Sequence, residues 1–200
     1  MKVEDILDLG GGRYKIVLDN GTVFSLYKKE LEQLEIAKGV QLSQKELCEI
    51  KETILLKRGK KRGLYLLEKQ GRSERNLIGK LQEGFYPEDV IVQIIDYVKS
   101  FGYLNDENLA RNIVESRMYQ KSYREIIGTL KSKEIKQETI DEVMDKYYAQ
   151  DGEKEAIKYL MNKKRIDLES ITEKDKNRFF NYLVRKGFSY DSILSSFNKN

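Results

Sequence analysis

The sequence predicts a mainly α-helical protein of three tandem three-helix repeats in an elongated, curved array, preceded by a small β-hairpin and helix extension. The prediction rests on two observations. The first 56 residues contain two short runs of β-branched and aromatic residues around a turn signal. From about residue 60 onward almost every segment has helical apolar spacing, and one pattern recurs three times. We expect four segments: the extension at 1–56 and the repeats at 57–104, 105–150 and 151–200.

The predicted hairpin lies between residues 13 and 28. Its strands are "RYKIVLD" and "TVFSLYK", and Asp19, Asn20 and Gly21 stand between them. Asn and Gly tolerate the positive φ angles of tight hairpin turns. An isolated hairpin is marginally stable in water, so we expect it to pack on a neighbouring helix. The helices expected behind it are "KKELEQLEI" and "SQKELCEIKETILLKR", with Gly39 as a break and Ser43 as N-cap.

The repeats align on three leucines. Leu81 and Leu130 are 49 residues apart, and Leu130 and Leu183 are 53 apart because "RIDLESITEK" lengthens a loop in the third repeat. The matching apolar columns are Leu77, Ile126 and Phe179; Ile78, Ile127 and Phe180; Tyr86, Ile135 and Phe188; and Ile91, Ile140 and Ile193. These columns predict one small core per repeat.

Polar columns and a preceding helix complete each repeat. N-cap residues are expected at Ser73, Ser122 and Asp175. Acidic residues are expected in the first turn of the following helix at Asp89, Glu138 and Asp191, where the helix dipole favours them. A further helix precedes each pair, in "GLYLLEKQ", "DENLARNIVESRMY" and "GEKEAIKYLMNKK". Each repeat therefore has three helices.

Composition excludes several classes of function. Hydrophobic residues make up 40% of the 200, but no run of about 18 apolar residues predicts a membrane span. The N-terminal segment lacks the apolar core of a secretory signal, so we expect a cytoplasmic protein. Cys48 is the only cysteine and histidine is absent, which removes disulfides, zinc ligation and histidine-based catalysis. We expect no catalytic residues, no metal and no cofactor.

The glycine and carboxylate patterns also fail to match enzymes. "GKKRGLY" and "GRSERNLIGK" lack the spacing of a phosphate-binding Walker loop, and the glycines at 10–12 precede a strand instead of a helix. Most carboxylates stand three or four residues from a lysine or arginine, which is typical of surface pairing. We therefore expect a protein that is not an enzyme.

Basic residues supply the candidate contacts. Residues 1–56 hold 8 Lys and Arg against 10 Asp and Glu, so the helical part carries the excess of the +4 net charge. The run "KRGKKR" lies where the extension joins the first repeat, and Lys163, Lys164 and Arg165 form another cluster. Such runs are commonly solvated surface, and contact with phosphates or an acidic partner is the alternative.

The middle repeat interleaves basic and aromatic residues. Tyr119 and Tyr123 stand among the cluster Arg111, Arg117, Lys121 and Arg124. This pattern fits a nucleic-acid backbone with stacked bases, whereas tyrosines at helical spacing are more often packing residues. A helix-turn-helix-like nucleic-acid module is therefore an alternative function.

"FGYLNDENLA" is the most distinctive segment. Gly102 can end one helix with a positive φ, Tyr103 and Leu104 can pack across a junction, and Asn105 or Asp106 can cap the next helix. We interpret the segment as structural.

The quoted repeats resemble the RecX family, the regulators of the RecA recombinase. The resemblance covers about residues 60–198 and is carried by "LLEKQGRSERNLIGKL", "GYLNDENLARNIVESR", "LKSKEIKQETI" and "LVRKGFSYDSIL". The hairpin and helix extension is similar to that of members from Gram-positive bacteria. Departures from the pattern are Asn105 and Leu109 at the first junction, and Phe85 in place of a glycine, with Gly84 displaced by one.

The resemblance implies a non-enzymatic modulator in DNA repair, homologous recombination and the SOS response. Such a protein binds the groove of the RecA–DNA filament and suppresses ATP hydrolysis and strand exchange. The partners implied are the RecA filament and single- and double-stranded DNA, with no membrane and no small-molecule substrate, and we expect a monomer. The predicted contact residues are Lys57, Arg58, Lys60, Lys61, Arg62, Arg72, Arg75, Arg111, Arg117, Lys121, Arg124, Arg178, Arg185 and Lys186.

Overall fold

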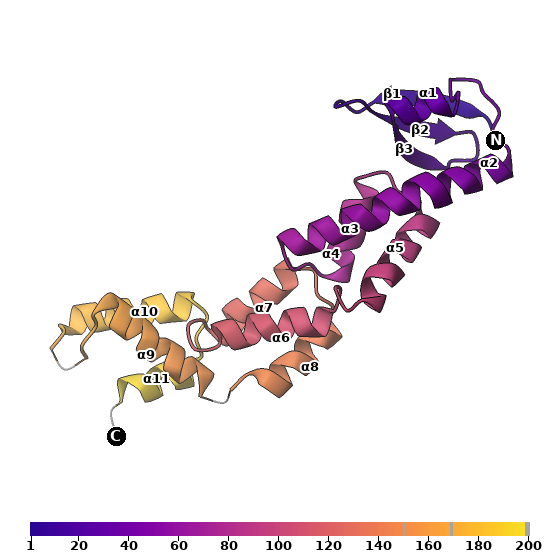
Figure 1. The fold of residues 1–200 in the computed structure, drawn as a ribbon. Helices are drawn as coiled ribbons and strands as arrows, with labels where there is room; N and C mark the ends of the chain where they lie inside the picture. The colour runs from indigo at the N-terminus through magenta and orange to yellow at the C-terminus, as the bar shows by residue number, and fades with distance from the viewer. Residues whose placement is uncertain (150, 169, 199–200) are drawn as a thin grey trace. The chain divides into compact units, whose positions relative to one another are not determined.

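The computed structural model describes residues 1–149, 151–168 and 170–198, and its elements are labelled in Figure 1. The chain forms two compact units, Met1–Asn105 (unit 1) and Asp106–Asn200 (unit 2). A mainly helical fold with a small N-terminal sheet confirms the predicted fold class. The limits of the four predicted segments stay a prediction.

Unit 1 begins with a three-stranded antiparallel sheet in the order β1 (Val3–Asp8), β2 (Arg13–Leu18) and β3 (Val23–Tyr27). The predicted hairpin is β2–β3: the Asn20 side chain accepts a 3.1 Å hydrogen bond from the Thr22 amide, and Gly21 has φ 80°. Strand β1 was not predicted, because its sequence "VEDILD" carries three carboxylates, which are rare in strands.

Helices of unit 1 follow the sheet directly. Helix α1 (Lys28–Gln33) is short, and then α2 (Gln44–Glu49), the π-helical segment η1 (Ile50–Leu56) and α3 (Lys57–Lys69) follow one another without a break. Ser43 caps α2 as predicted, since its Oγ accepts a 3.2 Å bond from the Glu46 amide. The unit ends with α4 (Glu74–Gln82) and α5 (Glu88–Ser100).

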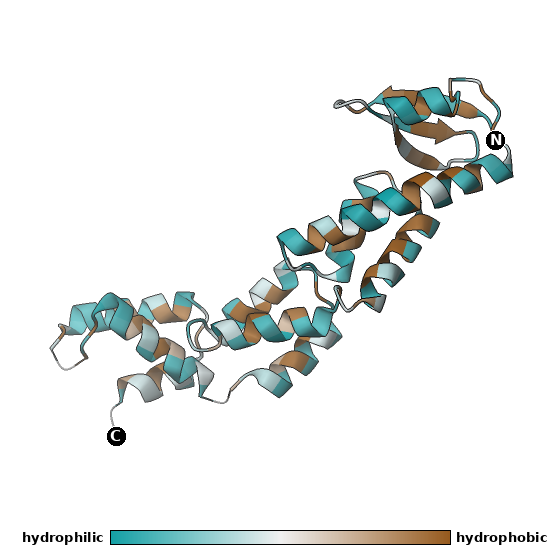
Figure 2. Ribbon diagram, in the orientation of Figure 1, coloured by the Kyte–Doolittle hydropathy of each residue, from teal (hydrophilic) through white to brown (hydrophobic). Residues whose placement is uncertain are grey.

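The sheet and the helices of unit 1 share one continuous hydrophobic core. Ile16 and Phe24 of the sheet belong to the same fully buried cluster as Leu77, Leu81 and Ile94 of the helices. Figure 2 shows the hydrophobic residues in brown along the strands and α5. Gly59 lets α3 and α5 approach closely, because a Cβ atom there would lie 2.2 Å from the Ile94 Cδ1 atom. The expected packing of the hairpin on helices is therefore present.

Unit 2 contains two three-helix repeats with separate cores. The second repeat is α6 (Asp106–Arg117), α7 (Tyr123–Ser132) and α8 (Gln137–Tyr147), and the third is α9 (Gly152–Lys164), α10 (Glu173–Arg185) and α11 (Tyr190–Phe197). Fully buried Leu130 lies at the centre of one cluster and fully buried Leu183 in the other. The leucine-centred columns therefore form the core of each repeat, as predicted.

The helix caps agree with the prediction in two repeats and differ in the third. Ser73 and Ser122 cap α4 and α7 through their side-chain oxygens. The prediction of Asp175 as the third cap is wrong: Thr172 caps α10, and Asp175 lies three residues later, where its amide donates to the Thr172 hydroxyl oxygen at 3.2 Å. The predicted acidic residues do lie in the first turns of α5, α8 and α11.

One helix-to-helix turn recurs in all three repeats. Its left-handed residue is Phe85, Glu134 or Gly187, with φ 59°, 60° and 82°. The next amide donates back to the central leucine carbonyl, as in Tyr86 to Leu81 at 3.3 Å and Phe188 to Leu183 at 3.2 Å. The exchange of glycine for phenylalanine therefore leaves the first turn unchanged in type.

Candidate partner-binding surface

Arg58, from the basic run at the start of the first repeat, makes its contacts inside unit 1. Its Nη1 donates to both carboxylate oxygens of Glu30 at 2.8 and 3.1 Å, and its Nη2 donates to the Ser25 carbonyl. The Arg58 Cζ atom also lies 5.1 Å from the Tyr27 ring centroid. Only 21% of its side-chain surface is exposed. Arg58 therefore ties α3 to the sheet.

Other predicted contacts in unit 1 divide into two groups. Arg72 closes the end of α3 by donating from Nε to the Leu66 carbonyl at 3.2 Å, and the Lys60 ammonium lies 4.6 Å from the Tyr97 ring centroid. The remaining side chains are exposed, on α3 and α4: Lys57, Lys61, Arg62 and Arg75.

The cluster predicted in the second repeat does not form a single site. Arg111 is half-buried with its Cζ atom 5.8 Å from the Tyr147 ring centroid, and Arg117 donates to the Thr129 hydroxyl at 3.3 Å. Arg124 packs its aliphatic part against Gly187, so it contributes to the contact between the second and third repeats. Of this cluster, Lys121 alone lines a described cavity.

Basic side chains gather in unit 2 around two cavities of about 540 and 370 Å³. The cavities share Lys164 and Tyr182 as walls, and the Lys164 ammonium lies 4.4 Å from the Tyr182 ring centroid. We call this surface the C-terminal basic cleft. Its charged residues are Lys121, Lys163, Lys164, Arg178, Arg185 and Lys186, with Glu125 and Asp175 as the two carboxylates.

Six cations against two carboxylates leave the C-terminal basic cleft strongly positive. Glu125 is shared between Lys186 at 3.0 Å and Lys121 at 3.5 Å. The hydrogen bond and charge of Glu125 raise the pKa of Lys186, so this ammonium is fully charged at neutral pH. An anionic partner is therefore the class of ligand that the cleft fits.

Tyr182 is held between neighbours and is not a free stacking platform. Its ring stacks on Phe179 with centroids 6.0 Å apart and an interplanar angle of 16°. Lys164 lies close to the same ring. Binding in this cleft is therefore expected to depend on charge and phosphate-like oxygens more than on stacked bases.

Four of the predicted contact residues line this cleft: Arg178, Arg185, Lys121 and Lys186. Lys163 and Lys164 also line it and are not among the predicted contacts. The spacing of Asp175, Arg178, Tyr182 and Arg185 along α10 places them on one helix face. The approach of α9 to that face is a tertiary contact that the sequence does not display.

A buried carboxylate joins the second and third repeats. Glu153, 8% exposed, accepts from the Tyr123 amide at 3.2 Å through Oε1. Through Oε2 it accepts from the amide and hydroxyl of Ser189 at 3.0 and 2.7 Å. Glu153 thus binds the N-termini of α7 and α11 together, where helix dipoles favour negative charge.

A second contact links the same repeats. The Ser122 hydroxyl, fully buried, donates to the Lys186 carbonyl at 2.7 Å while it accepts from the Glu125 amide. Tyr148 lies beside this junction; burial, then the charge of Glu153, raise the pKa of its hydroxyl well above the ordinary value. The junction is therefore polar and specific in geometry.

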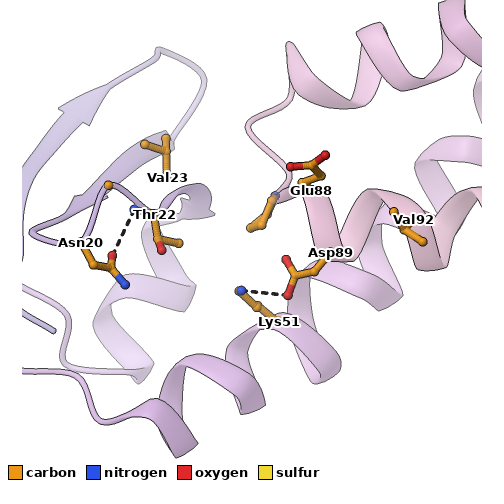
Figure 3. A pocket seen from close by; sticks show the side chains of 9 residues that line it. Asn20, Thr22, Val23, Lys51, Glu88, Asp89 and Val92 are labelled. Atoms are coloured by element: carbon orange, nitrogen blue, oxygen red, sulfur yellow. Dashed lines mark hydrogen bonds and ion pairs between the residues drawn. The ribbon is translucent and has the colours of Figure 1, made fainter.

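A further cavity, of about 750 Å³, lies in unit 1 and is shown in Figure 3. It lies between the β2–β3 turn and the start of α5, with Lys51 paired to Asp89 at 2.9 Å and Asn20 turned to its own loop. Its walls carry one lysine against Glu88 and Asp89, so it lacks the charge of the C-terminal basic cleft.

Over residues 1–149, 151–168 and 170–198, no three acidic or cysteine side chains come together as metal ligands. Within the same residues, no helix is long and apolar enough to cross a membrane. Cys48 is exposed, and its hydrogen bond to Glu52 raises the pKa of its thiol.

No protein-family model matches the chain, but individual proteins of one name are similar to it. The chain is 28% identical to "Regulatory protein RecX" of Bacillus subtilis (strain 168), over 94% of this chain and 72% of that protein. It is 28% identical to "Regulatory protein RecX" of Clostridioides difficile (strain 630), over 94% of this chain and 89% of that one.

Solved structures agree with these relatives. The "Crystal structure of regulatory protein RecX" superposes with a TM-score of 0.60 at 25% identity and covers 96% of both chains. The RecX structure from Lactobacillus salivarius has a TM-score of 0.57 at 25% identity, over 70% of this chain and 93% of that one. The relatives and the solved structures reported above all carry the name RecX, which agrees with the resemblance of the repeats.

Proposed function

We propose that this protein regulates the RecA recombinase without being an enzyme: it binds the RecA–DNA filament in the cytoplasm and lowers ATP hydrolysis and strand exchange. The observation that carries the proposal is the similarity to proteins named as RecX regulators over 94% of the chain. A regulator that acts by binding needs a complementary surface instead of tuned acids and bases.

The C-terminal basic cleft is the surface we assign to filament contact. Its excess positive charge fits the negative potential of a DNA-containing filament. Arg178 and Arg185 are its most suitable contacts, because both are exposed on one face of α10. Lys121 and Lys186 already share Glu125 and are expected to contribute less.

The test is a titration of the full chain into RecA assembled on single-stranded DNA, with ATP hydrolysis and filament length as readouts. The wild type is expected to lower both. The double variant Arg178→Glu, Arg185→Glu is expected to need at least about 10-fold more protein for the same inhibition, because the loss of even one charged contact costs about 1.5 kcal/mol or more. Unchanged hydrolysis and filament length at saturating wild-type protein would reject the regulator proposal.

A matched control separates the cleft from net charge. Lys131→Glu with Lys136→Glu makes the same charge change at exposed positions at the end of α7 and the start of α8, and neither residue lines the cleft. This control is expected to inhibit within about twofold of the wild type, since distant surface charges are screened. Equal loss in both double variants would show that the cleft is not the contact surface.

The same variants address the alternative of a nucleic-acid module that does not depend on RecA. Tight binding to DNA alone with a steep salt dependence, and no effect on RecA, would favour that alternative.

A further inference from the structure

Two serines in different units form equivalent hydrogen bonds. The buried Ser25 hydroxyl of β3 donates to the Gly84 carbonyl at 2.9 Å, and the buried Ser122 hydroxyl donates to the Lys186 carbonyl at 2.7 Å. Gly84 and Lys186 both lie three residues after the central leucine of their repeat, inside the recurring turn. The sheet therefore contacts the turn of the first repeat in the same way as the second repeat contacts the turn of the third.

A cavity lies next to each of these contacts. In unit 1 it has about 350 Å³ and lies between the sheet, α3 and the end of α4. Lys80 and Gly84 of this cavity occupy the repeat positions of Tyr182 and Lys186 in the C-terminal basic cleft. We call it the N-terminal basic cleft; its lining residues are Arg13, Ser25, Tyr27, Arg58, Arg62, Lys80, Glu83, Gly84 and Tyr86.

Two of the four cations in the N-terminal basic cleft are already neutralised. Arg58 is bound to Glu30, and Lys80 is bound to Glu83 at 2.8 Å. Among the described residues, Arg13 and Arg62 form no ion pair with a carboxylate. The two arginines therefore leave an uncompensated charge of about two in a mostly polar cavity, next to the hydroxyl-bearing side chains of Tyr27 and Tyr86.

Two uncompensated guanidinium groups suit a phosphate better than a single carboxylate. One guanidinium can satisfy a carboxylate by a bidentate contact, whereas a phosphate offers more acceptor oxygens and up to two charges. Arg13 comes from β2 and Arg62 from α3, so they reach the cavity from two different elements. Arg58 is fixed by Glu30 and the two tyrosine rings, which keeps the wall between them rigid.

We propose that the N-terminal basic cleft is a phosphate-binding site with Arg13 and Arg62 as the direct contacts. The phosphate belongs either to a nucleic-acid backbone or to a free polyphosphate, and the site needs no RecA to bind it. The sheet thus supplies one wall of the N-terminal basic cleft, as the second repeat supplies one wall of the C-terminal basic cleft.

The test uses the isotope-labelled full chain and two probes, pyrophosphate and a short oligothymidylate, followed by NMR. At least one probe is expected to shift the amide signals of Ser25, Gly84 and Tyr86. Arg13→Gln with Arg62→Gln is expected to weaken that binding about 10-fold or more, because charge-assisted contacts are lost. The control Lys61→Gln with Arg75→Gln removes the same charge from α3 and α4 outside the cleft and is expected to bind within about twofold of the wild type.

The two probes separate the two sources of phosphate. If oligothymidylate binds, we compare the slopes of log binding constant against log salt concentration. A slope that is smaller by about one to two in the double variant identifies a nucleic-acid backbone as the source of phosphate. Binding of pyrophosphate alone identifies a free polyphosphate. The proposal is overturned if neither probe shifts these signals, or if the double variant and the wild type bind equally. Arg62→Gln alone, at an exposed position, repeats the test if the double variant is not folded.

Discussion

Different forces hold the junction between the sheet and the first repeat in unit 1 and the junction between the second and third repeats in unit 2. In both junctions a serine hydroxyl donates to the equivalent carbonyl of the recurring turn. In unit 1 the sheet and the helices contribute to one hydrophobic cluster, to which hydrogen bonds of Ser25 and Arg58 are added. In unit 2 the two repeats keep separate clusters, and Glu153 and Ser122 join them by hydrogen bonds. The sheet–repeat junction is mainly apolar because both sides share one core, whereas the repeat–repeat junction is mainly polar.

This difference indicates which junction depends on single residues. Burial of apolar surface is non-directional and is spread over many side chains. Hydrogen bonds of a buried carboxylate are directional, and losing one partner leaves others unsatisfied. The orientation of the third repeat on the second, and with it the C-terminal basic cleft, should therefore be the more sensitive to point substitutions.

The largest effect is expected for Glu153→Gln. The amide keeps the size of the side chain but has one acceptor oxygen, so one of the two helix N-termini loses its partner. We expect the free energy of unfolding to fall by about 1.5–3 kcal/mol in urea denaturation. Amide hydrogen exchange should accelerate at the starts of α7 and α11 and stay unchanged in the sheet.

Glu155→Gln serves as the control on the same helix. Glu155 is exposed and pairs with Lys158 at 2.7 Å, so its loss is expected to change the free energy of unfolding by less than about 0.5 kcal/mol. If the two variants lose equal stability, the polar junction is not what holds the two repeats.

A smaller difference is expected between Ser122→Ala and Ser25→Ala. Ser122 caps α7 and also binds the Lys186 carbonyl, so its loss should cost about 2 kcal/mol. Ser25 provides the hydrogen bond to Gly84 without capping a helix, and its loss should cost about 1 kcal/mol. Thermal denaturation followed by circular dichroism compares the two; a larger loss for Ser25→Ala would contradict the contrast between the junctions.

The smallest effect is expected at the turn of the third repeat. Gly187 has φ 82°, and an added Cβ atom would lie 3.0 Å from the Cβ and Cδ atoms of Arg124. Gly187→Ala should therefore lower the free energy of unfolding by about 1 kcal/mol. In an Arg124→Ala background the loss should be smaller, because part of it is the contact with Arg124. Equal losses in both backgrounds, measured by urea denaturation, would show that backbone strain alone sets the cost.

Much of the local structure could be predicted from the sequence. The turn around Asn20 and Gly21, the caps Ser43 and Ser73, and the leucine-centred cores depend on residues close together in the chain. Two local features were misjudged. Strand β1 has too many carboxylates to be recognised as a strand, and Thr172 replaces Asp175 as a cap because α10 begins a turn earlier than the repeat pattern indicated.

The sequence by itself determined the repeat, its helix–turn–helix geometry and its excess of positive charge, because periodicity, capping and turn formation are local interactions. Only the tertiary structure decided which charges are available for a partner. Arg58 is neutralised by its ion pair with Glu30, whereas Lys164 of α9 lines the same cavity as Arg178 and Arg185 of α10. In the sequence a neutralised arginine and an uncompensated one look alike, since the difference is set by a carboxylate that approaches through the fold.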